Sequence, residues 1–133
     1  MSESELTSKT LTTNLWEVTD PGLPPKTSDR FVHILSAINT IDEWLQGFSQ
    51  QQLADDRRLQ LALERLLEII SVATDHIPAD LKKTEVSVDW QNLADIGRRL
   101  ENARDRIGPS VLWDVAQHKL LPLKTFAHRH VGA

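Results

Sequence analysis

Apolar residues recur at three- and four-residue steps along several stretches of the chain, which is the spacing of helices that bury one face. The first such stretch, residues 31–45, has Ser28 or Asp29 placed to cap its first turn and Gly47 placed to end it. The second, residues 59–77, is apolar over more than half of its circumference and ends at Pro78. This width predicts a helix buried on two sides, either central in a small bundle or shared with a second subunit.

Two more helices are predicted farther along the chain. Ser87 or Asp89 can cap a third helix, whose apolar face carries Trp90, Leu93, Ile96 and Leu100. A Gly-Pro pair then breaks the pattern, and Pro109 suits the first turn of a fourth helix, where its missing N–H costs nothing. Pro122 is expected to kink or split this last helix, because a proline inside a helix removes a hydrogen bond.

The segments between these helices are short. Residues 49–56 are predicted to be a polar turn, and residues 79–87 a connector. No stretch alternates apolar and polar residues for long enough to form a sheet. The predicted fold class is therefore all-α, a bundle of four to five helices.

The N-terminal part of the chain has a different character. Residues 1–27 are rich in polar residues and prolines and are predicted to be an extension, while residues 28–133 form the helical domain. Leu11, Leu15 and Trp16 are spaced so that a short helix could present them on one face. The segment is either a tail with one anchoring tryptophan or a segment that docks on a partner.

Composition narrows the possible functions. The chain has 133 residues, of which 40% are hydrophobic and 26% charged, and this balance is typical of a single globular domain. It contains no cysteine, which excludes disulfides, thiolate nucleophiles and iron–sulfur clusters, and no tyrosine. The net charge of −4 argues against broad nucleic-acid binding. With no membrane-length apolar run and no signal peptide, a cytoplasmic protein without a cofactor is expected.

The most distinctive polar feature is a cluster of arginines in and after the third predicted helix, Arg98, Arg99, Arg104 and Arg106. Guanidinium groups bind phosphate bidentately, so the cluster is a candidate site for an RNA backbone or a nucleotide. The alternative is a solvated face on which neighbouring acids pair with the arginines.

The histidines are weaker candidates for a functional site than the arginines. His33 falls off the main apolar stripe and is interpreted as a surface or interhelical hydrogen bonder. His128 and His130 are interpreted as a basic chain end rather than a metal site, because their spacing suits chelation poorly.

Residues 30–126 resemble the HepT-like branch of the HEPN proteins, which are small all-helical ribonuclease toxins. The likeness is carried by five strings in order: the segment from Arg30 to Ile38, that from Leu63 to Ile70, Val88-Asp-Trp90, Leu112-Trp113, and Leu121-Pro-Leu-Lys124. The interval between Trp90 and Trp113 matches that of the family without a gap. The resemblance implies a HEPN-like bundle with a short N-terminal extension.

The resemblance also implies a mechanism. In the family a homodimer forms a metal-independent cleft between its subunits, and an Arg/His/Tyr motif lines that cleft. The arginine and histidine serve transphosphorylation by the ribose 2′-hydroxyl. A minimal nucleotidyltransferase antitoxin silences the toxin by transferring AMP to the tyrosine.

This sequence departs from the motif. Alignment without gaps from Trp90 places Gly97 at the family's arginine, Arg98 at the following polar position, Asn102 at its histidine and Arg104 at its tyrosine. The family's Gly-Glu-Ala on the second helix reads here as Ser71-Val72-Ala73. A proton acceptor near neutral pH is therefore missing from the aligned positions.

The sequence thus predicts a HepT-like HEPN protein of toxin–antitoxin type that has lost its ribonuclease motif and acts as a dimeric binding or regulatory pseudoenzyme. Its expected partners are a second copy and a nucleotidyltransferase of the antitoxin type, another HEPN chain, or RNA. Two alternatives stay open. One is an active metal-independent ribonuclease with a substituted site of Arg98, Arg104 and His118, and the other is a helical partner-binding module unrelated to toxins.

Overall fold

The structure, a computed structural model, describes residues 27–102 and 107–131, and every regular element within these two segments is helical. The elements are α2 (Thr27–Leu45), α3 (Gln50–Ala54), α4 (Arg57–Asp75), α5 (Ala79–Lys82), α6 (Trp90–Glu101), α7 (Pro109–Asp114), the π-helical turn η1 (Val115–Lys119) and α8 (Leu120–His130). The all-α, HEPN-like bundle is confirmed. None of these helices has both the length and the hydropathy needed to cross a membrane.

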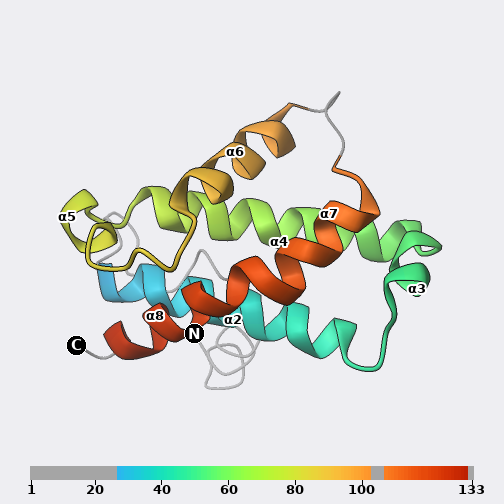
Figure 1. The fold of residues 1–133 in the computed structure, drawn as a ribbon, viewed down its shortest axis with the longest axis horizontal. Helices are drawn as coiled ribbons and strands as arrows, with labels where there is room; N and C mark the ends of the chain where they lie inside the picture. Colours follow the sequence, from blue (N-terminus) through green and yellow to red (C-terminus); the bar gives the residue numbers. More distant parts are fainter. Residues whose placement is uncertain (1–26, 103–106, 132–133) are drawn as a thin grey trace, which may run out of the picture.

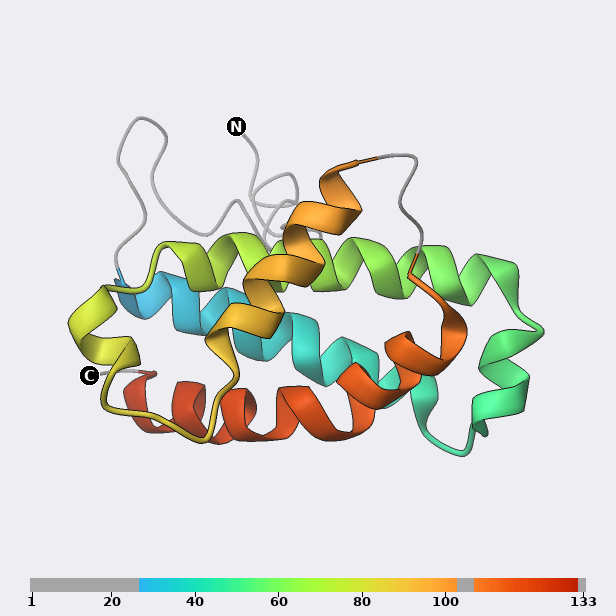
Figure 2. The same cartoon turned by 45° about the horizontal axis from the view of Figure 1, so that its top comes forward.

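The long helices run alternately up and down the molecule (Figures 1 and 2). α4 lies between α2 and α6 and packs against both, while α8 packs on another side of α2. The short helix α3 closes one end of the bundle against α7. The prediction that residues 59–77 form a central helix is confirmed, since α4 is covered on two sides.

Phe126 of α8 joins three parts of the bundle. Its ring meets Phe31 of α2 edge-on at 5.6 Å between centroids, and Trp90 of α6 at 5.4 Å. The indole N–H of Trp90 donates to the carbonyl oxygens of Lys82 and Glu85, 3.1 and 3.2 Å away. The connector that precedes α6 is therefore tied to the core through Trp90.

Two of the predicted helix boundaries are confirmed and one is wrong. Asp89 caps α6, because its Oδ1 accepts from the backbone N–H of Asn92 at 3.0 Å. Gly47 ends α2 with a φ of +79°, a conformation that glycine adopts at little cost. Ser28 and Asp29 do not cap α2, since the helix already begins at Thr27 and both residues lie in its first turn.

The segments predicted as a polar turn and a connector each contain a short helix. α3 begins at a capping box in which the Ser49 hydroxyl accepts from the N–H of Gln52, while the Gln52 side chain accepts from the N–H of Ser49. α5 forms one turn directly after Pro78. The predicted extension lies outside the described residues, apart from Thr27.

Pro122 lies inside α8 and does not split it. The disruption occurs just upstream, where the N–H of Leu120 bonds to the carbonyl of Val115 five residues earlier and forms the π-helical turn. A proline offers no N–H and crowds the carbonyl four residues before it, and an extra residue in the preceding turn relieves this strain. The helix therefore continues to His130, whose ring stacks on Phe31 at 5.2 Å.

Candidate functional site

α6 carries the positions at which the family motif would lie. Leu93, Ile96 and Gly97 are its buried residues, and Arg98 and Arg99 lie in its exposed last turn. Positive side chains at this end are favoured by the partial negative charge of the helix C-terminus. The sequence of α6 therefore explains both its burial and the basic character of its end.

Gly97 lies where α6 crosses α4, and it has no room for a side chain. A Cβ built at this position would overlap the Oγ of Ser71 and come within 2.6 Å of its Cβ. Ser71 is itself buried on α4. Position 97 is thus a point of close contact between the two helices, and the Ser71 side chain occupies the space beside it.

A groove between α6 and α7 collects the other described candidates. It is lined by Arg98, Arg99 and Asn102 together with Asn92, Asp95, Ile96 and Val111. Arg98 pairs with Asp95 one turn earlier on the same helix. Arg99 and Asn102 also have interaction partners. The structure thus brings together three of the sequence-predicted site residues, Arg98, Arg99 and Asn102.

The remaining candidates are not brought to this groove. Arg104 and Arg106 lie outside the described residues, so a cluster of four arginines stays a prediction. His118 is exposed on the π-helical turn and does not line the groove.

The groove's described lining supplies two guanidinium groups, two amides and the Asp95 carboxylate, which pairs with Arg98, but no imidazole. Cleavage by a ribose hydroxyl needs a group that accepts a proton near neutral pH, and histidine is the side chain whose ordinary pKa suits that step. Guanidinium groups and amides instead donate hydrogen bonds to phosphate oxygens. Within residues 27–102 and 107–131, no three metal-binding side chains gather in one place. The arrangement is suited to binding phosphate.

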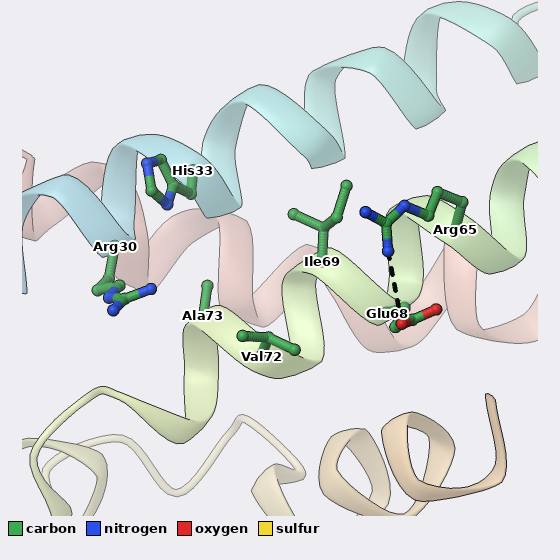
Figure 3. A pocket seen from close by; sticks show the side chains of 7 residues that line it. All are labelled: Arg30, His33, Arg65, Glu68, Ile69, Val72 and Ala73. Carbon is green, nitrogen blue, oxygen red and sulfur yellow. Dashed lines mark ion pairs between the residues drawn. The ribbon is translucent and has the colours of Figure 1, made fainter. Parts of the chain in front are cut away.

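A second candidate site, between α2 and α4, was not predicted from the sequence (Figure 3). His33 is only 4% exposed there, and its Nε2 has no hydrogen-bond partner. The alternative that His33 is a surface residue is wrong, and its Nε2 makes no hydrogen bond to either helix. Its burial lowers the pKa of the imidazole below the ordinary 6.5; Arg30 lowers it further and Asp29 partly opposes the shift. The ring is therefore neutral at pH 7.

Comparisons with known proteins identify relatives of this chain. The family described as "Ribonuclease HepT-like" matches residues 34–130. The chain is 29% identical over 96 residues to a probable ribonuclease HepT of Thermococcus cleftensis, covering 72% of this chain and 87% of that protein. It is 24% identical over 99 residues to a putative RNase of Methanocaldococcus jannaschii, covering 74% and 82%. No solved structure matches. Because the family match spans most of the chain, this protein belongs to the ribonuclease HepT-like family.

Proposed function

We propose that this chain is a HepT-like protein that has lost the ribonuclease reaction and acts by binding, as a homodimer in a toxin–antitoxin type of system. Its partners are RNA phosphates and a nucleotidyltransferase of the antitoxin type. Membership of the family removes the alternative of a helical module unrelated to it.

The observation that carries the proposal is the contact between Gly97 and Ser71. By alignment from Trp90, Gly97 stands where the family has its arginine, and Ser71 stands where the family has a glycine. Here the small residue lies on α6 and the larger one on α4, and the Ser71 Oγ fills the space that a Cβ at position 97 needs. An arginine at position 97 alone would therefore not fit without moving the two helices apart.

The aligned histidine position supports the same conclusion. Asn102 forms the C-cap of α6 and is exposed beside the arginines of the groove. Its amide neither accepts nor releases a proton near pH 7, so it cannot replace a histidine in acid–base catalysis. Arg98 and Arg99 keep the ability to bind a phosphodiester through their guanidinium groups.

A second candidate function is an active ribonuclease with a substituted site. It is favoured by the names of the two relatives, a probable ribonuclease HepT and a putative RNase. Arg98, Arg104 and His118 would then be its catalytic residues. The absence of His118 from the lining of the α6–α7 groove favours the binding function.

The test is cleavage of bulk tRNA in the presence of a metal chelator, with the products separated on a gel. We expect the wild type to be inert, and we expect activity in the variant Ser71→Gly, Gly97→Arg, Asn102→His, Arg104→Tyr. The matched control keeps Ser71 and carries the other three changes, and it should cut less because the arginine is crowded. Cleavage by the wild type that Arg98→Ala abolishes would show instead that the protein is a ribonuclease with a rebuilt site.

Binding and assembly are measured on the same preparations. RNA affinity should fall on Arg98→Met and on Arg99→Met. The dependence of log affinity on log salt should also become shallower in each variant, because fewer phosphates are then neutralised by the protein. Sedimentation should give a dimer at micromolar concentration. A strict monomer there would exclude a cleft shared between two subunits.

A further inference from the structure

Between α2 and α4 the structure leaves a cavity of about 150 Å³ that is distinct from the groove of α6. Figure 3 shows Arg30 and His33 on α2 and Ile69 and Val72 on the facing part of α4. A cavity of this size holds a single six-membered ring or a molecule of similar bulk.

The polar groups of the cavity are incompletely bonded. His33 is more than nine-tenths buried, and its Nε2 has no partner. The Nε of Arg30, one helical turn earlier, is also buried without a partner. A buried donor left without an acceptor costs free energy, and in native proteins such groups usually have a partner. The Arg30 Nε is a donor, and the His33 Nε2 is a donor in one of the two tautomers of the neutral ring, so a single acceptor in the cavity can bond to both nitrogens.

The charged residues around the cavity favour a ligand with a single negative charge. Arg65 and Glu68 lie at one end and pair with each other, with 3.4 Å between Nη1 and Oε1. Asp29, next to Arg30 in the chain, also acts electrostatically on His33, but within the described part of the chain no ion pair neutralises Arg30. A monoanion can pair with its guanidinium, whereas a doubly charged phosphate would meet the Glu68 carboxylate and too few cations.

The rest of the wall is apolar. Ile69 and Val72 line the side formed by α4, and the Val72 side chain is left 43% exposed. Apolar surface of this kind is stabilised by an apolar partner and not by a small hydrated ion. A ligand that satisfies both sides of the cavity has an anionic end and an apolar body.

The geometry points to a binding site for a small monocarboxylate with an apolar body, about the size of benzoate. Its carboxylate bonds to the guanidinium of Arg30 and accepts from the Nε2–H of His33. Its apolar body packs on Ile69 and Val72. None of these residues lines the groove of α6, so the site does not depend on the proposed function.

The test is a titration of the full chain with benzoate. Binding is monitored through the NMR resonances of the His33 ring and of the Ile69 and Val72 methyl groups. The His33→Phe variant identifies the ring signal by its loss. We expect all three sets of signals to move together with one dissociation constant. Arg30→Met should weaken binding about tenfold or more, because it removes a hydrogen bond to a charged group.

Two controls distinguish pairing of the carboxylate with Arg30 from binding of the apolar ring alone. Arg57→Met removes an exposed arginine of α4 that does not line the cavity and should leave the affinity unchanged. Benzyl alcohol, which has the ring without the charge, should bind at least tenfold more weakly than benzoate. If millimolar benzoate leaves the wild-type signals unmoved, the proposal is wrong. If inorganic phosphate moves them and benzoate does not, the site is a phosphate site and the carboxylate assignment is wrong.

Discussion

The contact between Gly97 and Ser71 allows a quantitative test of the crossing of α4 and α6. Replacing a glycine by alanine in the interior of a helix stabilises a protein by about 1 kcal/mol where the added methyl group has room, because alanine restricts the unfolded chain and favours the helix. At position 97 the added Cβ would lie 2.6 Å from the Ser71 Cβ. Rotation of the serine hydroxyl cannot relieve this contact, since a Cβ is fixed to its backbone. The two helices must therefore move apart.

The expected magnitude follows from these opposing effects. Overpacking of a close-packed core costs about 1–3 kcal/mol, which exceeds the helix propensity gained. The difference between this cost and the gain predicts that Gly97→Ala lowers the free energy of unfolding by up to about 2 kcal/mol. Adding Ser71→Gly removes the colliding atoms, so the double variant should be destabilised much less than the two single changes together would suggest. The coupling energy should be about 1–3 kcal/mol.

The assay is urea unfolding of the wild type, both single variants and the double variant, followed by circular dichroism at one fixed protein concentration. Gly108→Ala serves as a control for crowding only: nothing lies within 4 Å of a Cβ at that position, and any loss of stability there comes from its place as the N-cap of α7. Stabilisation by Gly97→Ala would refute the reasoning, as would additive effects of the two substitutions. Either result would mean that α4 and α6 are not held at this separation. The conclusion that an arginine does not fit at position 97 would then lose its support.

Three further predictions concern stability. Since the pKa of His33 is lowered in the folded protein, the unfolded chain binds a proton that the native ring does not as pH falls below 6.5. The free energy of unfolding should therefore decrease as the pH is lowered through that range, and it should decrease less in His33→Phe than in the wild type. The same pH dependence of urea unfolding in both proteins would contradict this. Asp89→Ala should cost about 1 kcal/mol, because the N–H of Asn92 loses its acceptor. The exposed Asp80→Ala is its control, with an expected change below about 0.5 kcal/mol by the same measurement. Phe126→Ala should lower the free energy of unfolding by about 3–5 kcal/mol, because Phe126 is only 1% exposed and its removal leaves a cavity in the core. A loss under about 1 kcal/mol would mean that the aromatic contacts are not formed.

Much of the bundle could be predicted from the sequence, because helix formation depends on local spacing and on a few short-range signals. The broad apolar face of residues 59–77 predicts a central helix, and Asp89 and Gly47 mark real boundaries. The capping box of Ser49 and Gln52 is also a local signal, and it could have predicted α3. The start of α2 was misplaced because Thr27, Ser28 and Asp29 all have side chains suited to cap a helix, and the sequence alone does not select among them.

The candidate sites depended on contacts between distant residues. The amino-acid sequence alone is enough to predict that α6 ends in arginines and that residues 90–101 contain no histidine. Only the tertiary structure decided that Gly97 is closed by Ser71 and that His33 is buried with an unbonded nitrogen beside Arg30. The physical reason is that helical periodicity reports which face of a helix is apolar. It does not report which face of another helix packs there, or how much space the two leave between them.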